Sequence, residues 1–438
     1  MDQTEALIIE TIDRHREEIL EFARDIYSHA ELGYKEFQTS GKFVKKMEQL
    51  GLRTEKGFAI TGVKAYLNED KKENASLALL GELDALRIPE HAFANPETNA
   101  AHCCGHHAQM AGVFGAALAL TVPEIAEKLD GQVVFFATPA EEYGEIEFKN
   151  QLREQGKIRY GGGKCELLRI GAFDDIDLCL THHIRPGNEI LVGNGTGNGF
   201  VSKVIRVLGK ASHAAGAPEK GVNALSAASL GLQALGLNRE TFRDEDCVRV
   251  HPIITKGGNL VNVIPDEVVV ETLVRGKTIE AFTDAAKKTD RSFKAGAIAM
   301  GAKVEISTLP GYLPTLAEEA LPELKHAAEI SASGIPVIEA SGHAGGSTDV
   351  GDVQHLMPVY TFNTGGVKGG LHQIDFEVTN EEEAYIVTAK MFALAAYGLL
   401  KEKAQRSREL VDQYEPVFKN SAEYVEFMEQ FDSKEIFE

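Results

Sequence analysis

The sequence predicts an α/β protein in which a mostly parallel sheet is flanked by helices and a smaller β-α-β-β-α-β domain is inserted. Three observations predict this class. Three apolar runs rich in β-branched and aromatic residues alternate with helical stretches. Each of these runs ends in acidic residues or histidines. From about residue 199 the alternation changes to the order strand, helix, strand, strand, helix, strand.

The first half of the chain supplies the parallel sheet. Residues 5–51 have the pattern of two helices, which the motif HAELGYKEF (29–37) interrupts. Three buried strands follow: SLALLGELDAL (76–86), GQVVFFATPAEEYGE (131–145) and DIDLCLTHHIRPG (175–187). We expect helices between them, at 107–121 and 147–156. The carboxyl ends of such parallel strands meet at one edge of the sheet, where binding crevices form.

The inserted domain is expected over 199–310, between a first part of the larger domain at 1–198 and a second part at 311–438. Its elements are, in order, FVSKVIRVLGK, a helix at 221–237, CVRVHPIITKG, EVVVETLVRG, a helix at 279–301 and KVEISTLP. This order is the ferredoxin-like split unit, which is compact enough to fold alone. Beyond it we expect a helix at 315–330, a glycine-rich segment at 341–378, a helix at 380–402 and a charged, helical tail at 405–438.

Composition excludes some functions. With 45 basic and 66 acidic residues among 438, the net charge of −21 argues against a nucleic-acid partner, because binding phosphates needs a basic face. No apolar run matches the roughly 18 residues of a membrane span, and the acidic start lacks the pattern of a signal peptide, so we expect a cytoplasmic protein without a membrane partner. The five cysteines are an odd number without a CxxC pair, which disfavours disulfides and a closed thiolate zinc site.

The stretch HCCGHH (102–107) indicates a metal site. Cys104 and His106 flank one glycine, so a sharp turn can direct both side chains into the same cleft. Thiolate and imidazole are good zinc ligands, and imidazole also suits manganese. A single cysteine or histidine is more often structural, but five such residues in six positions favour a metal. His102 and Cys103 need not be ligands, because alternate residues of an extended turn face opposite ways.

Other strand ends add carboxylates and histidines. Glu141 and Glu142 are adjacent and face different directions in extended backbone, so one can bind a metal while the other accepts a proton. Only one residue of the pair His182 and His183 is expected to be a ligand, for the same reason. His372 follows a flexible glycine run and is meaningful only together with the others. The glycine-rich pieces GNGTGNG and GGGKC match neither a dinucleotide fingerprint nor a phosphate-binding loop.

These residues are more than one four-coordinate ion needs. Two divalent ions about 3.5–4 Å apart, sharing a water molecule, would use one cysteine, three histidines and one glutamate. Such a site lowers the pKa of the water, and the second glutamate can take the proton. The sequence therefore predicts a hydrolase that attacks the carbonyl of an amide.

The motifs also resemble a known family, the dinuclear metallo-amidohydrolases and exopeptidases of the aminoacylase and carboxypeptidase G type. The resemblance extends over nearly the whole chain, through HAELGYKEF, GELDAL, HCCGHH, TPAEEYG, GKASHAAGAPEKGVNAL, NVIPD, STDVGDV and GLHQ. It is strongest to the branch with a Cys-Gly-His metal motif, which contains aminobenzoyl-glutamate hydrolases, indole-acetyl-amino-acid hydrolases and dipeptidases. It implies a metallo-exopeptidase-like catalytic domain, an inserted lid or dimerisation domain, and two divalent ions, Mn or Zn.

The resemblance assigns roles to individual residues. The implied metal ligands are Cys104, His106, Glu142, His183 and His372. Glu141 matches the general base, and Asp84 matches the acid that orients a ligand, a role that ligand histidines commonly need. His213 matches a histidine that enters the partner subunit's active site and stabilises the oxyanion, which implies a homodimer through 199–310. Asn262 and Arg275 match residues that hold the substrate's carboxylate, and Gly346, Ser347 and Thr348 would line the same cleft.

Two departures from the family pattern affect the substrate. His107 stands where the branch usually has Asp or Asn. The segment 145–160 separates EEYG from GGGK, which are nearly contiguous in the aminobenzoyl-glutamate branch, and it can reshape the substrate pocket. The prediction is a hydrolase of an N-acyl amino acid, an aryl-glutamate or a dipeptide. The alternatives are a non-catalytic or partner-dependent metal-binding subunit, and a thiol enzyme that uses Cys103 or Cys104.

Overall fold

The computed structural model describes residues 1–332 and 334–438, which form two compact units. The large unit comprises Met1–Gly195, Leu316–Gly342 and Asp352–Ser421, and the small unit comprises Thr196–Thr315, His343–Gly351 and Ala422–Glu438. The small unit thus extends beyond the inserted segment 199–310. It also takes two pieces, 343–351 and 422–438, that were expected in the second part of the larger domain.

The large unit is built on an eight-stranded, largely parallel sheet, which confirms the predicted fold class. The strand order is β1-β2-β6-β3-β7-β17-β8-β15, and the central strands β6, β3, β7 and β17 all run parallel to their neighbours among these four. The strands are β1 (Arg53–Phe58), β2 (Gly62–Leu67), β3 (Ser76–Glu82), β6 (Gln132–Thr138), β7 (Leu178–Ile184), β8 (Ile190–Val192), β15 (Val337–Glu339) and β17 (Val359–Thr364).

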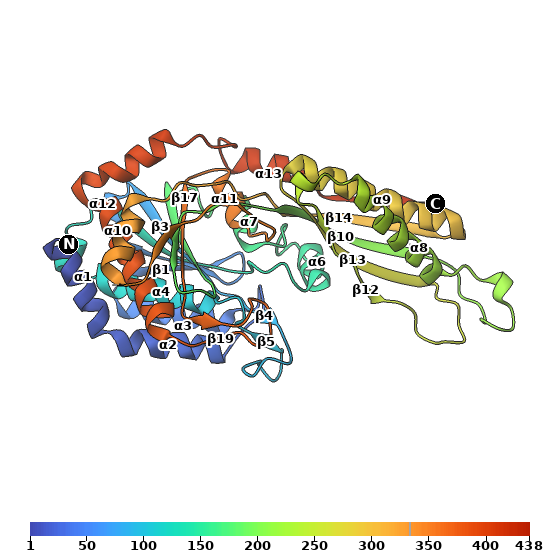
Figure 1. Ribbon diagram of the computed structural model, residues 1–438, viewed down its shortest axis with the longest axis horizontal. Helices are drawn as coiled ribbons and strands as arrows, with labels where there is room; N and C mark the ends of the chain where they lie inside the picture. The colour runs from blue at the N-terminus through green and yellow to red at the C-terminus, as the bar shows by residue number, and fades with distance from the viewer. Residues whose placement is uncertain (333) are drawn as a thin grey trace. The chain divides into compact units, whose positions relative to one another are not determined.

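Helices bury both faces of this sheet, which is why its central strands are apolar along their whole length. Helix α4 (His106–Leu120) packs on β3 and β7 and against α12 (Thr388–Gln413), and every residue of α4 is buried (Figure 1). A Cβ at Gly112 would lie 2.5 Å from Thr388, so glycine allows this close helix contact. Further helices of the unit are α1 (Gln3–Arg14), α2 (Arg16–Ser28), α3 (Phe37–Gln49) and α10 (Pro322–Ser331).

The helix predicted at 380–402 is longer than expected. It begins with the π-helical turn η5 (Glu382–Val387) and continues as α12, with non-helical backbone at Lys401–Ala404. The whole stretch Glu382–Gln413 is long and apolar enough to cross a membrane, but 94% of its apolar window is buried inside the protein. It therefore has the character of a core helix.

The small unit is an antiparallel sheet with two helices on one face. Strands β10 (Gly199–Leu208), β11 (Arg249–Val250), β13 (Glu267–Gly276) and β14 (Lys303–Tyr312) form the order β11-β13-β10-β14, and β12 (Ile253–Lys256) also pairs with β13. This is the strand order of the ferredoxin-like split unit. Helices α8 (Ala224–Leu237) and α9 (Ile279–Met300) lie side by side against the sheet (Figure 1).

The C-terminal tail completes the small unit's sheet. The prediction of a helical tail over 405–438 is only partly right, because residues 405–413 belong to α12 and α13 (Ser421–Glu429) is a helix, but β20 (Ser433–Phe437) is a strand. Strand β20 pairs antiparallel with β14, from Val304 opposite Phe437 to Thr308 opposite Ser433. The tail therefore covers a sheet edge that the inserted segment alone would leave open.

Short elements complete the chain. They are β4 (Leu86–Arg87), β5 (Ala100–Ala101), β9 (Thr196–Gly197), β16 (His343–Ala344), β18 (Val367–Lys368), β19 (Glu377–Val378), α5 (Pro123–Ala126), α6 (Ile146–Glu154), α7 (Gly163–Arg169) and α11 (Val350–Gln354), with 3-10 turns at η1 (Glu69–Lys71), η2 (Pro218–Lys220), η3 (Asn238–Thr241) and η4 (Asp244–Asp246).

The carboxyl group of the half-buried Glu318 makes the stability of the large unit depend on pH. Burial raises the pKa of Glu318 to about 8, although its carboxylate accepts hydrogen bonds from the amide of Thr361 and the side chain of Gln354. The neutral form therefore favours folding. Its stabilising effect is complete below the ordinary carboxyl pKa and is lost as the pH rises toward 8.

Replacing Glu318 by glutamine should remove this dependence. In wild type we expect the free energy of unfolding to fall by about 2–4 kcal/mol from this group between pH 5 and pH 8. Urea unfolding at both pH values measures it, with Glu319→Gln, an exposed neighbour, as the control. Equal pH dependence in wild type and the Glu318 variant would show that Glu318 ionises in the fold as it does in water.

Candidate metal centre

Five predicted ligands converge in the large unit around the sulfur of Cys104. Its Sγ lies 3.3 Å from Nε2 of His183 and 3.2 Å from Nε2 of His372. Cys104, His106 and His183 form one group, and Cys104, Glu142 and His372 form a second, with the candidate ligand atoms of each group within 4.8 Å of one another. Cys104 is the member that the two groups share.

Local backbone explains how the chain delivers Cys104 and His106 to one place. Gly105 has a φ of 86°, and α4 begins directly after it. A Cβ at this position would lie 2.0 Å from Ile184, so only glycine fits. The neighbour Cys103 lies in the hydrophobic core instead.

Hydrogen bonds to atoms that do not face the metal centre fix the orientation of the ligand side chains. Nδ1 of His106 lies 2.9 Å from the carbonyl oxygen of Asp84 and 3.1 Å from its Oδ1, so this nitrogen carries the proton. The other oxygen of Asp84 accepts the amide of Glu142 at 2.9 Å. Nδ1 of His183 donates to the carbonyl of Ile184 at 2.7 Å. In both histidines Nε2 is therefore left as the ligand atom, as in metal sites with ordered outer partners.

A third group of candidate ligand atoms contains His106 and two carboxylates. One of them, Glu82, is not predicted from the sequence. Glu82, His106 and Glu141 place their candidate ligand atoms within 4.8 Å of one another. Nε2 of His106 lies 3.1 Å from Glu82 and 3.9 Å from Glu141. Glu82 is the last residue of β3 and stands two residues before Asp84, and this spacing is the available sequence signal.

Lys164 of the GGGK motif belongs to the same network. Its fully buried ammonium pairs with Oε1 of Glu82, whose Oε2 accepts a 2.8 Å hydrogen bond from Gln109. Burial is the largest single influence and opposes the charge of Glu82, but the ion pair and hydrogen bond with Lys164 together with the nearby His106 outweigh it and lower the pKa to about 2. Glu82 is thus an anion at neutral pH, held by residues far apart in the sequence.

The pKa of Cys104 distinguishes it from a nucleophilic cysteine. Burial, and then the charge of Glu142, raise the pKa of Cys104 well above its usual value. Nucleophilic cysteines have a lowered pKa and sit among cations. Burial also raises the pKa of Cys103 to about 12. Neither cysteine therefore has the environment of a nucleophilic thiol.

The remaining histidines of the two motifs are buried and neutral. Burial lowers the pKa of His102, His107 and His182 below the usual range. Nε2 of His182 lies 2.8 Å from the hydroxyl of Thr364, and Nε2 of His107 lies 3.1 Å from the hydroxyl of Tyr385. His107, which stands where the branch usually has Asp or Asn, thus packs against Tyr385 and is not one of the converging ligands.

The donor set fits metal ions. Nε2 of His106 and Oε1 of Glu142 are buried and make no hydrogen bond of good geometry, although Glu82 and His372 each lie 3.1 Å away, so both atoms remain open to a metal ion. Sulfur, imidazole and carboxylate together suit zinc and other borderline divalent ions. The residues present can therefore hold two ions, with Cys104 between them.

The six predicted site residues of the small unit form two groups. His213 and Asn262 are neighbours, because His213 bridges Val263 and the amide of Ala214 donates to the carbonyl of Asn262 at 2.9 Å. Arg275 donates to the hydroxyl of Ser347 at 3.3 Å, beside Gly346 and Thr348. His213 and Asn262 are exposed, whereas Arg275 and Ser347 are half-buried.

These two groups lie at opposite ends of the small unit's sheet. Arg275 pairs with Phe200 at one end of the β10–β13 ladder, and Glu267 pairs with Leu208 at the other. His213 and Asn262 belong to the loops that adjoin the Leu208 end. The eight residue steps from Glu267 to Arg275 correspond to about 26 Å of strand. Within one chain, Asn262 and Arg275 are thus too far apart to hold the same carboxylate.

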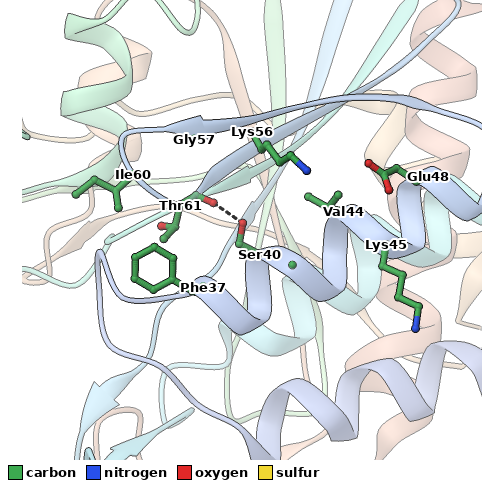
Figure 2. A pocket seen from close by; sticks show the side chains of 10 residues that line it. Phe37, Ser40, Val44, Lys45, Glu48, Lys56, Gly57, Ile60 and Thr61 are labelled. Carbon is green, nitrogen blue, oxygen red and sulfur yellow. Dashed lines mark hydrogen bonds between the residues drawn. The ribbon is translucent and has the colours of Figure 1, made fainter.

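The structure also has an open surface groove of about 450 Å³, which contains none of the predicted site residues (Figure 2). It lies between α3 and the β1–β2 turn, with Ser40 and Thr61 among its lining residues. The metal centre is therefore defined by converging donor atoms and not by this groove.

Comparison with known proteins agrees with the site. Residues 78–397 match peptidase family M20/M25/M40. The chain is 27% identical to the Xaa-Arg dipeptidase of Mus musculus over 408 residues, covering 90% of this chain and 85% of that protein. It is 24% identical to the N-acetyl-L-cysteine deacetylase of Bacillus subtilis, with shares of 89% and 90%. It is 27% identical to one of the subunits of p-aminobenzoyl-glutamate hydrolase from Escherichia coli, with shares of 70% and 60%.

Solved structures share the fold. A dinuclear metal-binding peptidase of this family from Bacillus subtilis superposes with a TM-score of 0.61 at 23% identity, covering 89% of this chain and 99% of that one. An aminobenzoyl-glutamate utilization protein from Klebsiella pneumoniae gives a TM-score of 0.65 at 18% identity, with shares of 90% and 98%. The chain belongs to peptidase family M20/M25/M40 and is a metal-dependent hydrolase of amide or peptide bonds with a site for two metal ions.

Proposed function

We propose that this enzyme hydrolyses the amide bond of a small N-acyl amino acid, aryl-glutamate or dipeptide that carries a free carboxylate, and that its metal ions are Mn or Zn. One observation carries the proposal: Cys104 belongs to two groups of candidate metal-ligating atoms, with Glu141 in a third group that shares His106. The names of the relatives support the substrate class, since they include a dipeptidase, an N-acyl amino acid deacetylase and an aryl-glutamate hydrolase. Its five free cysteines suit a reducing compartment such as the cytoplasm.

The large unit provides the chemistry. When bound, two divalent ions lower the pKa of a water molecule and polarise the substrate carbonyl. Glu141, which is 9% exposed, accepts a proton at its carboxylate and returns it to the leaving amine. Asp84 keeps Nδ1 of His106 protonated and holds the amide of Glu142, so both side chains keep their orientation.

The small unit provides substrate contacts. The planar guanidinium of Arg275, beside Ser347, suits a substrate carboxylate. Nδ1 of His213 accepts the amides of Ala215 at 3.2 Å and Gly216 at 2.9 Å. Nε2 of His213 therefore carries the proton and can donate it to a developing oxyanion.

The distance between these two groups supports a homodimer. Because His213 and Arg275 lie at opposite ends of one sheet, we infer that a substrate takes its carboxylate contact from one chain and its oxyanion donor from a second chain. A two-fold dimer supplies both to each of two sites.

Mixing two inactive variants should therefore restore activity. Glu141→Gln and His213→Ala are each expected to have little turnover. About half of the dimers formed on co-expression are mixed, and in each of these one of the two sites combines an intact Glu141 with an intact His213. The whole preparation should therefore recover about a quarter of wild-type activity. Mixing Glu141→Gln with Asp84→Asn, whose lesions lie in the same unit, is the control and should restore nothing. No recovery in the first mixture would mean that each site comes from one chain.

A substrate panel tests the reaction itself. Metal-free enzyme is reconstituted with two equivalents of Mn or Zn and offered N-acetyl amino acids, p-aminobenzoyl-glutamate and Xaa-Arg dipeptides, each also as the carboxamide. We expect hydrolysis of at least one free acid and loss of most activity on its carboxamide, because the Arg275 contact needs an anion. Equal rates on acids and carboxamides, or no hydrolysis with either metal, would contradict the proposal.

A further inference from the structure

The motif HAELGYKEF, residues 29–37, contains none of the metal ligands and no proposed base, yet it lies between two strand ends that carry them. The carbonyl of Glu31 accepts the amide of Ala85 at 2.8 Å, just after Asp84. On its other side, a Cβ at Gly33 would lie 3.1 Å from Ala140, just before Glu141. The segment therefore contacts the backbone beside Asp84, which orients the ligands, and beside Glu141, the proposed base.

The turn that carries Glu141 has an unfavourable backbone. Ala140 has a φ of 49°, in the left-handed region that residues with a Cβ avoid. Its carbonyl accepts the amide of Gly163 at 3.0 Å, and a Cβ at Gly163 would lie 1.6 Å from the carbonyl oxygen of Pro139. A non-glycine residue keeps such a conformation only where its surroundings enforce it.

Glu36 makes the hydrogen bond that fixes this residue. Its Oε1 accepts the amide of Ala140 at 2.8 Å, and its Oε2 accepts the hydroxyl of Thr61 at 2.7 Å. The side chain of Glu36 is fully buried. Thr61 is itself held through its carbonyl, which accepts the hydroxyl of Ser40 at 2.7 Å, as the dashed line in Figure 2 shows. Glu36 thus links α3 and the β1–β2 turn to the turn before Glu141.

Other side chains of the motif act on the same region. The hydroxyl of Tyr34 donates to the carbonyls of Tyr160 and Gly162, at 3.0 and 3.2 Å. Lys35 pairs with both oxygens of Glu145. These contacts fix the two sides of the segment that departs from the family pattern, so the motif as a whole supports residues 139–163.

We propose that Glu36 is a positioning residue, which holds the amide of Ala140 and thereby fixes the carboxylate of Glu141 at the reacting centre. This rests on the proposed role of Glu141 as the base. Without Glu36 the amide of Ala140 is buried without an acceptor, and the left-handed turn is free to relax. A displacement of about 1 Å in a catalytic group lowers turnover by about 100-fold.

The test compares Glu36→Ala with Glu36→Gln. Glutamine keeps an oxygen for the Ala140 amide and can donate its own amide to Thr61, so its kcat should stay within about threefold of wild type. Alanine should lower kcat by about 10- to 100-fold with KM nearly unchanged. Both variants should still bind two metal ions, because Glu36 contacts no ligand side chain. Equal losses in the two variants would overturn the proposal.

The matched control is Glu31→Ala. Glu31 is a buried carboxylate in the same motif, but it accepts the amides of Gln38 and Thr39 at the start of α3. Its removal should lower the melting temperature without lowering kcat. If Glu36→Ala does not fold, Thr61→Val removes one of the two bonds to Glu36 and should lower kcat by about threefold or more, while an unchanged kcat would contradict the proposal.

Amide hydrogen exchange gives a readout that does not depend on activity. Peptides that contain Ala140 should exchange faster in Glu36→Ala than in wild type or Glu31→Ala. Unchanged exchange would overturn the positioning role. Faster exchange with a normal kcat would instead show that the turn moves without affecting catalysis. In that case the assignment of Glu141 as the base would be wrong, while the hydrogen bond from Ala140 to Glu36 would still hold the turn.

Discussion

Replacing Glu141 by glutamine is expected to lower kcat by about 10²- to 10⁴-fold while the chain still binds two metal ions. Glutamine has nearly the same shape but cannot accept a proton at neutral pH. Glu141 also lies outside the two groups that share Cys104, so both of those groups remain complete. Steady-state kinetics together with metal analysis of the purified variant measures both parts of the prediction.

The control for this variant is Glu145→Gln. Glu145 is four residues further along the chain and pairs with Lys35. It contacts no predicted ligand, so its replacement should leave kcat within a few-fold of wild type. If Glu141→Gln turns over substrate at a nearly normal rate, the proton acceptor is another group, and Glu82 would be the first candidate because it also contacts His106.

Replacing Cys104 by alanine is expected to abolish both activity and binding of the second metal ion. The sulfur is the atom common to the groups that contain His106 and Glu142. Its loss leaves each group one ligand short, and a histidine–carboxylate pair alone holds a divalent ion weakly. Metal analysis should find fewer than two ions per chain, and added Mn or Zn should raise the melting temperature less than in wild type.

Cys103→Ala separates this effect from a general effect of removing a thiol. Cys103 is fully buried in the hydrophobic core, next to Cys104 in sequence. Its replacement should lower stability by about 1 kcal/mol or more through the small cavity that it leaves, with two metal ions retained. A Cys104 variant that binds two ions as tightly as wild type would contradict the shared-ligand geometry.

The convergence of the candidate ligands could be predicted in part, because some of them follow local rules. Glu142 and His183 lie at or just after the ends of β6 and β7, and the carboxyl ends of parallel strands meet at one edge of a sheet, whereas Cys104 lies just before α4. The alternation of side chains in extended backbone predicts that only one residue of the pair His182 and His183 is a ligand. In the structure Nε2 of His183 lies beside Cys104, and Nε2 of His182 lies beside Thr364. The order of elements in the small unit likewise follows from patterns within single segments.

Other features depend on contacts between distant segments and could not be predicted. The ion pair of Glu82 with Lys164 joins residues 82 positions apart, and GGGK is in itself only a glycine-rich turn. Strand β20 is five residues long and owes its form to pairing with β14, more than a hundred residues earlier. The hydrogen bond from Ala140 to Glu36, which gives HAELGYKEF its proposed purpose, joins residues 104 positions apart. No local pattern contains information on these partners.

A crystal structure of the full chain with Mn or Zn, with anomalous scattering recorded at the metal's absorption edge, tests the central claim most directly. The account predicts two anomalous peaks about 3.5–4 Å apart, with the sulfur of Cys104 bound to both, His106 and His183 on one ion, and Glu142 and His372 on the other. A single peak, or two peaks that do not share Cys104, would contradict it.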